Sequence, residues 1–226
     1  MTITALSATA VFLLGARLPV GSDPHFESYY QEALKFTEPE PHRAMAMLEL
    51  LLVPLNTEIY VDLGTVPENL RGRFATGIDR GFKLWQDALG EDFPFRLTYE
   101  ARNKPAMVIR IVDKIDDDYH QMGEMLITRR VSWSKRSHRG EIEGHMKISQ
   151  FARPGRVLTV DEVTHIVAHE LGHAFGLNDV ENVREIMGPV LIGKPFARLT
   201  DGEVRRVVQT RETIRDEYRA ALKAQR

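Results

Sequence analysis

Hydrophobic and polar residues change their spacing along the chain, and each change predicts a different kind of element. Between Pro67 and Gly90 the apolar residues recur in steps of three and four, which predicts one long helix with a buried stripe. The stripe consists of Leu70, Phe74, Ile78, Phe82, Trp85 and Leu89. Short runs rich in β-branched and aromatic residues, each bounded by turn residues, predict five strands. These strands cover residues 59–63, 95–99, 107–112, 125–133 and 145–149.

Capping boxes mark the start of two later helices. In a capping box, a threonine and a glutamate three residues later accept hydrogen bonds from each other's backbone N–H groups. Thr159 with Glu162 predicts the start of one helix, and Thr200 with Glu203 predicts the start of the last. The first of these helices has an apolar face made of Val163, Val167, Leu171 and Ala174. Strands that alternate with helices in this way predict the α/β class.

Residues 23–56 have a helical pattern of their own. Two short stretches with helical periodicity, residues 26–36 and 42–52, flank the breaker Thr37-Glu38-Pro39-Glu40-Pro41 and so predict a helical hairpin. We expect the hairpin to be a packing extension of a main domain that spans residues 57–226. A pro-segment that covers a cleft is the alternative.

The start of the chain contains an apolar run, residues 5–16, that is too short to span a bilayer but fits the core of a signal peptide. No Lys or Arg precedes this run, and the large Leu14 disfavours cleavage nearby. Residues 1–22 are therefore expected to be a signal peptide or a packed N-terminal segment. A signal peptide would imply a secreted or periplasmic location, and a packed segment would leave a cytoplasmic location open.

Composition narrows the chemistry and the partners. The chain has 30 basic and 32 acidic residues, and its net charge of -2 provides no overall field that attracts nucleic acid or an anionic membrane. We therefore expect neither a nucleic-acid partner nor a stable membrane span. There are no cysteines, which excludes disulfides, thiolate metal ligands and a cysteine nucleophile.

The stretch from His169 to Asp179 carries the candidate chemistry. His169 and His173 are four residues apart, so on a helix both imidazoles reach one metal ion, and Glu170 can act as a base beside them. Gly176 can take positive φ and end the helix, so that Asp179 returns as a third ligand. Three protein ligands leave a fourth position for water, as in catalytic zinc sites. A surface helix with two incidental histidines is the alternative.

A second motif, Glu185-Ile186-Met187-Gly188-Pro189, follows this helix. Together the two motifs resemble the metzincin peptidases, in which a methionine turn forms a hydrophobic floor beneath the metal. From about Thr57 to Tyr218 the order of elements looks most like a matrixin-type catalytic domain. Matrixins carry histidine as the third ligand where this chain has Asp179, and in this respect the chain resembles snapalysin, a small bacterial metzincin.

The resemblance implies a zinc-dependent endopeptidase that hydrolyses a protein or peptide substrate through a zinc-bound water activated by Glu170. It also implies a twisted, mixed five-stranded sheet with long helices and a zinc cleft. Residues 125–133 would form the sheet edge above that cleft and pair with substrate as an added strand. The expected metal ligands are His169, His173 and Asp179, with Gly176 and Met187 as structural support.

Two other functions stay open at this point. In a gluzincin-like peptidase the third ligand is a glutamate from a later helix, and Glu203 is the candidate; Gly176 and Met187 argue against it. In a non-catalytic module the zinc only stabilises the fold and the hairpin binds a partner. Glu170 argues against this second alternative, because a structural site needs no base.

Three further features are weaker candidates. His165 precedes His169 by four residues but drifts about 40° around the helix, so we expect it to support or pack rather than bind metal. A cluster of aspartates is a candidate Ca²⁺ site, although a solvated acidic turn fits its spacing better; its members are Asp113, Asp116, Asp117 and Asp118. The basic stretch 129–139 predicts a solvated hairpin or, alternatively, a rim that favours acidic substrates.

Overall fold

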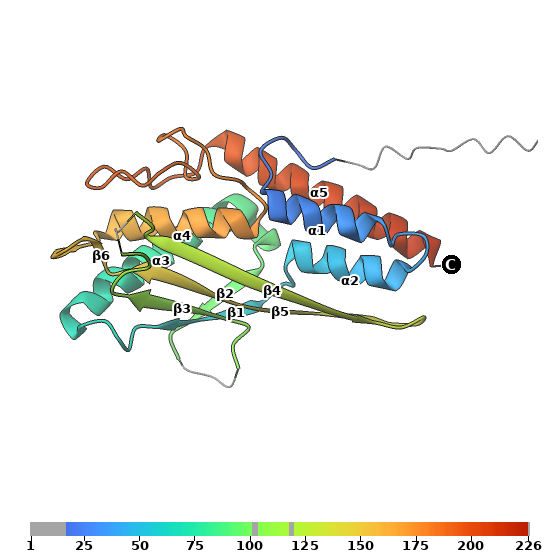
Figure 1. The fold of residues 1–226 in the computed structure, drawn as a ribbon, viewed down its shortest axis with the longest axis horizontal. Helices are drawn as coiled ribbons and strands as arrows, with labels where there is room; N and C mark the ends of the chain where they lie inside the picture. Colours follow the sequence, from blue (N-terminus) through green and yellow to red (C-terminus); the bar gives the residue numbers. More distant parts are fainter. Residues whose placement is uncertain (1–16, 101–103, 118–119, 226) are drawn as a thin grey trace, which may run out of the picture.

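The computed structural model describes residues 17–100, 104–117 and 120–225, and Figure 1 shows their arrangement. Five strands form one sheet in the order β2-β1-β3-β5-β4. In chain order they are β1 (Thr57–Asp62), β2 (Phe95–Thr98), β3 (Met107–Val112), β4 (Gly123–Trp133) and β5 (His138–Ser149). All neighbours are parallel except β4 and β5, which are antiparallel. The predicted α/β class with a mixed five-stranded sheet is therefore confirmed, and β4 is an edge strand.

Helices cover the sheet (Figure 1). They are α1 (Pro24–Leu34), α2 (Pro41–Leu52), α3 (Glu68–Leu89), α4 (Val160–Ala174) and α5 (Asp201–Ala224), with a 3-10 turn at Gly90–Asp92. Both predicted capping boxes are present, at Thr159 and at Thr200, and they begin α4 and α5. Proline occupies the first turn of α1 and of α2, where its missing N–H leaves no hydrogen bond unmade.

The helices α3 and α4 approach each other at backbone distance. A Cβ atom added at Gly77 would lie 2.6 Å from Val163 Cβ, and one at Gly81 would lie 2.7 Å from Val167 Cβ. One glycine per turn of α3 therefore receives one valine per turn of α4. One turn further on, the buried Trp85 donates its indole N–H to the carbonyl oxygen of Ala168 at 2.7 Å. These contacts fix how far along α3 the helix α4 lies.

The prediction for the last strand was wrong at its start. We expected this strand to begin at residue 145, but β5 begins at His138 and pairs with β4 from His138 to Ile148. Residues 138–144 contain Ile142 as their only large apolar residue beside Arg, Glu, His and Gly, so hydrophobic alternation could not reveal them, and pairing with β4 makes them a strand. A short hairpin of β6 (Phe151–Arg153) and β7 (Arg156–Val157) was also not predicted.

The helices α1 and α2 lie over the outer part of the β4–β5 hairpin (Figure 1). Their buried residues, among them Phe26, Tyr30 and Leu48, share one apolar cluster with Ile214 of α5. Arg211 of α5 also donates to the carbonyl oxygen of Leu52 at 2.9 Å. The α-hairpin thus packs against the rest of the chain.

Two expectations about membranes concern different parts of the chain. The apolar run of residues 5–16, and with it the question of a signal peptide, lies outside the described residues. Within the described ranges, no helix is both long and apolar enough to cross a membrane.

The contact between α3 and α4 makes a testable prediction. We expect Gly81→Ala to lower the free energy of unfolding by about 1–3 kcal/mol, because its methyl group would overlap Val167. Gly72 lies on the same helix with nothing within 4 Å of an added Cβ, so Gly72→Ala should raise that free energy by about 0.5–1 kcal/mol. Denaturant unfolding of both variants measures the difference, and equal effects would contradict the close contact.

Candidate metal centre

The chain reverses directly after α4, as the sequence predicted. Gly176 has a φ of 89°, and its N–H donates to the carbonyl oxygen of His173 at 3.0 Å. The N–H of Leu177 then donates to the carbonyl oxygen of Gly172 at 2.9 Å. A residue with a side chain adopts this φ only at an energetic cost, so glycine suits the turn. The reversal brings Asp179 back beside the two histidines of α4.

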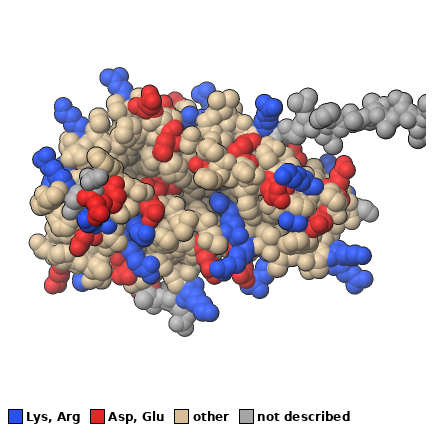
Figure 2. All heavy atoms as spheres, viewed as in Figure 1, with Lys and Arg blue, Asp and Glu red and all other residues tan. Residues whose placement is uncertain are grey.

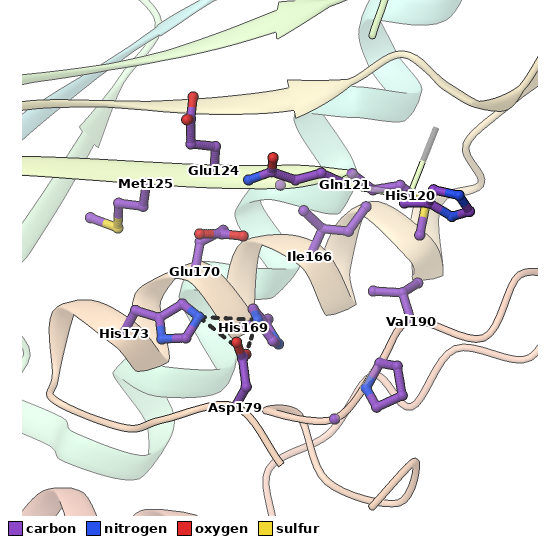
Figure 3. Close-up of a pocket in the computed structure, with 14 residues that line it drawn as sticks. His120, Gln121, Glu124, Met125, Ile166, His169, Glu170, His173, Asp179 and Val190 are labelled. Atoms are coloured by element: carbon purple, nitrogen blue, oxygen red, sulfur yellow. Dashed lines mark hydrogen bonds and ion pairs between the residues drawn. The ribbon is translucent and has the colours of Figure 1, made fainter. Parts of the chain in front are cut away.

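Three side-chain atoms meet in a compact triangle (Figure 3). The two Nε2 atoms of His169 and His173 are 3.2 Å apart. Asp179 Oδ1 lies 3.1 Å from the first of these atoms and 3.4 Å from the second. Three ligand atoms bound about 2.0–2.1 Å from a tetrahedral zinc ion lie about 3.3 Å from one another. The donor set and its spacing therefore fit zinc.

Backbone carbonyl groups orient both imidazole rings. His169 Nδ1 lies 3.0 Å from the carbonyl oxygen of Ile186, and His173 Nδ1 lies 3.0 Å from that of Leu177. A carbonyl oxygen only accepts hydrogen bonds, so in each neutral ring the proton belongs on Nδ1. The Nε2 lone pairs then face the point between the rings, as is usual for metal-binding histidines.

The electrostatics of the triangle favour positive charge at its centre. The pKa of Asp179 is lowered, mainly by its hydrogen bond with His169, so the group stays a carboxylate. Burial pulls the pKa of His169 down, but the hydrogen bond to Asp179 and the charge of Glu170 raise it overall. For His173, burial and the nearby His169 lower the pKa.

Glu170 lies on the side of α4 that faces β4 (Figure 3). Only 6% of this residue is exposed. Burial raises the pKa of Glu170 to about 7; His169 opposes the rise, while Asp179 and Glu124 add to it. A carboxyl group that titrates near neutral pH can both accept and return a proton. Glu170 shares a cavity of about 430 Å³ with the triangle.

The sequence did not predict how β4 approaches this glutamate. A Cβ atom on Gly123 would collide with Glu170 Oε1 and with Ile166, so a side chain there would displace the carboxyl group where the strand passes the helix. The next residue, Glu124, forms an ion pair with Lys147 at 2.7 Å and contributes negative charge near Glu170. The predicted strand began at residue 125, so Gly123 lay outside it and gave no clear signal for this contact.

Met187 forms a buried floor under α4. Its Sδ atom lies against Gly172, where a Cβ would collide with it, and its N–H donates to Glu203 Oε1 at 2.9 Å. The other oxygen of Glu203 accepts from the N–H of Thr200 at 2.8 Å and from its hydroxyl at 2.7 Å. Glu203 is thus occupied with the capping box and the N–H of Met187. Among the described residues, the group that could hold a metal ion consists of His169, His173 and Asp179.

Two buried residues of α4 hold the segment that follows Met187. His165 Nδ1 accepts from the N–H of Phe196 at 3.1 Å, so its Nε2 donates to the carbonyl oxygen of Gly188 at 3.1 Å. Burial lowers the pKa of His165 to about 4, which keeps this ring neutral. Glu162 accepts from the N–H of Gly193 at 2.7 Å. His165 therefore has a positioning role and is not part of the triangle.

The segment before α1 supports the loop that carries Asp179. The N–H of Asp23 donates to the carbonyl oxygen of Gly176 at 2.8 Å, and the N–H of Asn178 donates to that of Gly21 at 3.0 Å. Phe26 of α1 packs directly against Gly176. No described residue before position 57 lines the cavity around Glu170. The sequence predicted a packing extension but not this contact with the third candidate ligand.

The other charged features form local pairs. Asp116 accepts hydrogen bonds from the N–H groups of His120 and Gln121, and Asp117 pairs with Lys114, while Asp118 lies outside the described residues. In the basic hairpin, Arg130 pairs with Glu143 and Arg139 pairs with Glu141. Figure 2 shows acidic and basic side chains interspersed over the face in view.

No protein-family model and no curated protein matches this chain. An account of its function therefore depends on the geometry and chemistry of the site itself.

Metal binding by the triangle can be tested with two variants. We expect Asp179→Ala to weaken Zn²⁺ binding by at least about 100-fold. Removing a residue that only orients a metal ligand costs about 10- to 100-fold in affinity, and removing a ligand itself should cost no less. The variant Glu203→Gln should keep the affinity within about threefold, since Glu203 bonds to Thr200 and Met187 instead. Competition with a chromogenic chelator measures both affinities. A larger loss in Glu203→Gln than in Asp179→Ala would contradict the ligand assignment.

Glu162 makes a prediction about pH. Burial alone would raise the pKa of this group, but hydrogen bonds from Arg156, Thr159 and Gly193 lower it to about 2. Stabilisation by the ionised group is therefore present above about pH 4.5 and is lost as the pH falls toward 2. We expect Glu162→Gln to cost about 2–3 kcal/mol of unfolding free energy at pH 7, and the difference from wild type to shrink below pH 5.

Urea unfolding between pH 2 and pH 7 measures this difference. The control is Asp161→Asn at the exposed neighbour of Glu162, whose ion pair with Arg80 should contribute less than about 0.5 kcal/mol. A destabilisation by Glu162→Gln that did not change with pH would show that packing, and not charge, is responsible.

Proposed function

We propose that this protein is a zinc-dependent endopeptidase of the metzincin type, similar in its order of elements to a matrixin catalytic domain. The observation that carries the proposal is a triangle of two imidazole nitrogens and one carboxylate oxygen, 3.1–3.4 Å apart, beside the buried Glu170. Asp179 takes the place of the third histidine of matrixins, as the aspartate of snapalysin does. Met187 beneath α4 adds support for a methionine turn.

Each residue has a separate role in hydrolysis. His169, His173 and Asp179 would hold the metal. When bound, zinc supplies Lewis acidity that polarises the scissile carbonyl and makes a water molecule more acidic. Glu170 accepts a proton from the attacking water and returns it to the leaving amine nitrogen, so the proton count balances. The negative charge of Asp179 would make a bound zinc ion a weaker Lewis acid than it would be with three neutral imidazole ligands.

The substrate is proposed to bind in extended form along β4. This strand is the edge of the sheet, and Gly123, Glu124 and Met125 from its beginning line the same cavity as the triangle. A free strand edge offers backbone N–H and C=O groups that pair with an added strand. An extended peptide at this edge would pass Glu170 with its backbone exposed to attack.

The two alternative functions find less support. The carboxylate of Glu203 is bonded to Thr200 and to the N–H of Met187, so it is not free to act as a gluzincin ligand. Structural zinc sites use four protein ligands and are closed. Here three donors lie at the wall of a cavity of about 430 Å³, next to a carboxyl group with a raised pKa.

Glu170→Gln tests the catalytic proposal. The substitution keeps the shape of the side chain but removes its ability to accept a proton, so we expect peptide hydrolysis to fall by at least about 100-fold. Zn²⁺ content and thermal unfolding should stay close to wild type, because Glu170 is not one of the proposed ligands. Hydrolysis of a peptide library, together with metal analysis of the same sample, provides the measurement. A zinc-loaded Glu170→Gln protein with full activity would refute the mechanism.

A further inference from the structure

A second cavity, of about 570 Å³, continues from the metal centre along β4. One wall is formed by α1 and the residues at its start, and the other by β4. Met125 and His173 line both this cavity and the one around Glu170, so the two lie next to each other beside the triangle. A peptide that lies along β4 and passes Glu170 therefore also passes the second cavity.

Arg129 is the basic residue of β4 in this cavity. Its guanidinium carbon lies 5.9 Å from the centre of the Phe26 ring and 5.7 Å from that of Tyr29. Its Nε–H donates to the carbonyl oxygen of Leu50 at 3.3 Å. These contacts hold the side chain in place while the terminal N–H groups of its planar fork stay available to a carboxylate.

No carboxylate of the described residues forms an ion pair with Arg129, unlike Arg130 and Arg139 on the same hairpin. Asp23 lines the same cavity, but its Oδ1 accepts from the N–H groups of His25 and Phe26, both at 2.9 Å, and caps α1. Burial lowers the pKa of Arg129, and the charge of Asp23 raises it from there but does not outweigh burial. The guanidinium of Arg129 is thus held in place without an ion-pairing carboxylate among the described residues.

Resting on the proposed function, we propose that this cavity is a substrate subsite in which Arg129 selects an acidic side chain. The strand β4 runs from Gly123, beside Glu170, toward Trp133. A peptide paired antiparallel to β4 would place its N-terminal residues beside Arg129. Four residues separate Met125 from Arg129, or about 13 Å at the usual rise of a strand. We therefore expect the acidic residue roughly two to four positions before the scissile bond.

The test compares paired peptides that carry Glu or Gln at each of four positions on either side of one cleaved bond. For wild type we expect the kcat/KM ratio of the Glu to the Gln peptide to reach about 10 at one of the N-terminal positions. In Arg129→Gln the ratio should fall to about 1. A merely structural role for Arg129 would lower both rates and leave the ratio unchanged. The matched control is Arg130→Gln at the adjacent residue, which pairs with Glu143 and should keep the wild-type ratio.

Two outcomes overturn the inference: a wild type without preference for Glu at any N-terminal position, or a preference that persists in Arg129→Gln. If Arg129→Gln does not fold, Arg129→Lys keeps the charge but loses the fork, and its ratio should lie between 1 and that of wild type. A ratio in Arg129→Lys equal to that of wild type would then count against recognition by the guanidinium.

A binding measurement separates this inference from the proposed function. Fluorescence anisotropy of labelled Glu and Gln peptides with the Glu170→Gln protein needs no hydrolysis. If wild type cleaves no peptide, the proposed function fails. The subsite would still be supported if Glu170→Gln binds the Glu peptide more tightly than the Gln peptide and the double variant Glu170→Gln/Arg129→Gln does not. Equal binding of both peptides would overturn it.

Discussion

The close packing of α4 against its neighbours is the constraint on which the rest of the site depends. On three sides a glycine allows the contact: Gly81 of α3 receives Val167, Gly123 of β4 makes room for Glu170, and Gly172 of α4 itself receives the sulfur of Met187. A side chain at Gly81 would push against Val167, one at Gly123 would displace the carboxyl group of Glu170, and one at Gly172 would displace the sulfur of Met187. Because both histidines and the glutamate lie on this one helix, their distances to Asp179 and to β4 depend on these contacts.

Three buried glutamates on α4 and α5 show how surroundings decide the chemistry of one residue type. Glu162 accepts hydrogen bonds from Arg156, Thr159 and Gly193, and the pKa of its carboxyl group falls to about 2. Glu203 binds Thr200 and the N–H of Met187. Both of these carboxylates stabilise the fold by accepting hydrogen bonds at the start of a helix and from a neighbouring loop. Glu170 is buried beside other negative groups, and the pKa of its carboxyl group rises to about 7. Burial raises the pKa of a carboxyl group unless hydrogen bonds stabilise its ionised form. A buried carboxyl group with too few such bonds therefore titrates near neutral pH and is suited to proton transfer.

The α1–α2 hairpin connects the architecture to substrate recognition. The backbone of residues 21–23 pairs with residues 176–178, so the hairpin supports the loop that carries Asp179. The same hairpin presents Phe26 and Tyr29 to Arg129 and forms a wall of the second cavity. One appendage thus contributes to the position of a candidate ligand and, on our proposal, to the choice of substrate.

Features that depend on short-range spacing could be predicted from the sequence. Histidines four residues apart, the capping boxes at Thr159 and Thr200 and the turn at Gly176 all follow from helical geometry and glycine stereochemistry, and the structure has them where they were predicted. Only the tertiary structure decided the first half of β5, the contact of Gly123 with Glu170, the support of the Asp179 loop by residues 21–23 and the unpaired charge of Arg129. Each of these depends on which distant segments lie side by side. Strand register and helix packing set those neighbours, and periodicity within one segment carries no information about them.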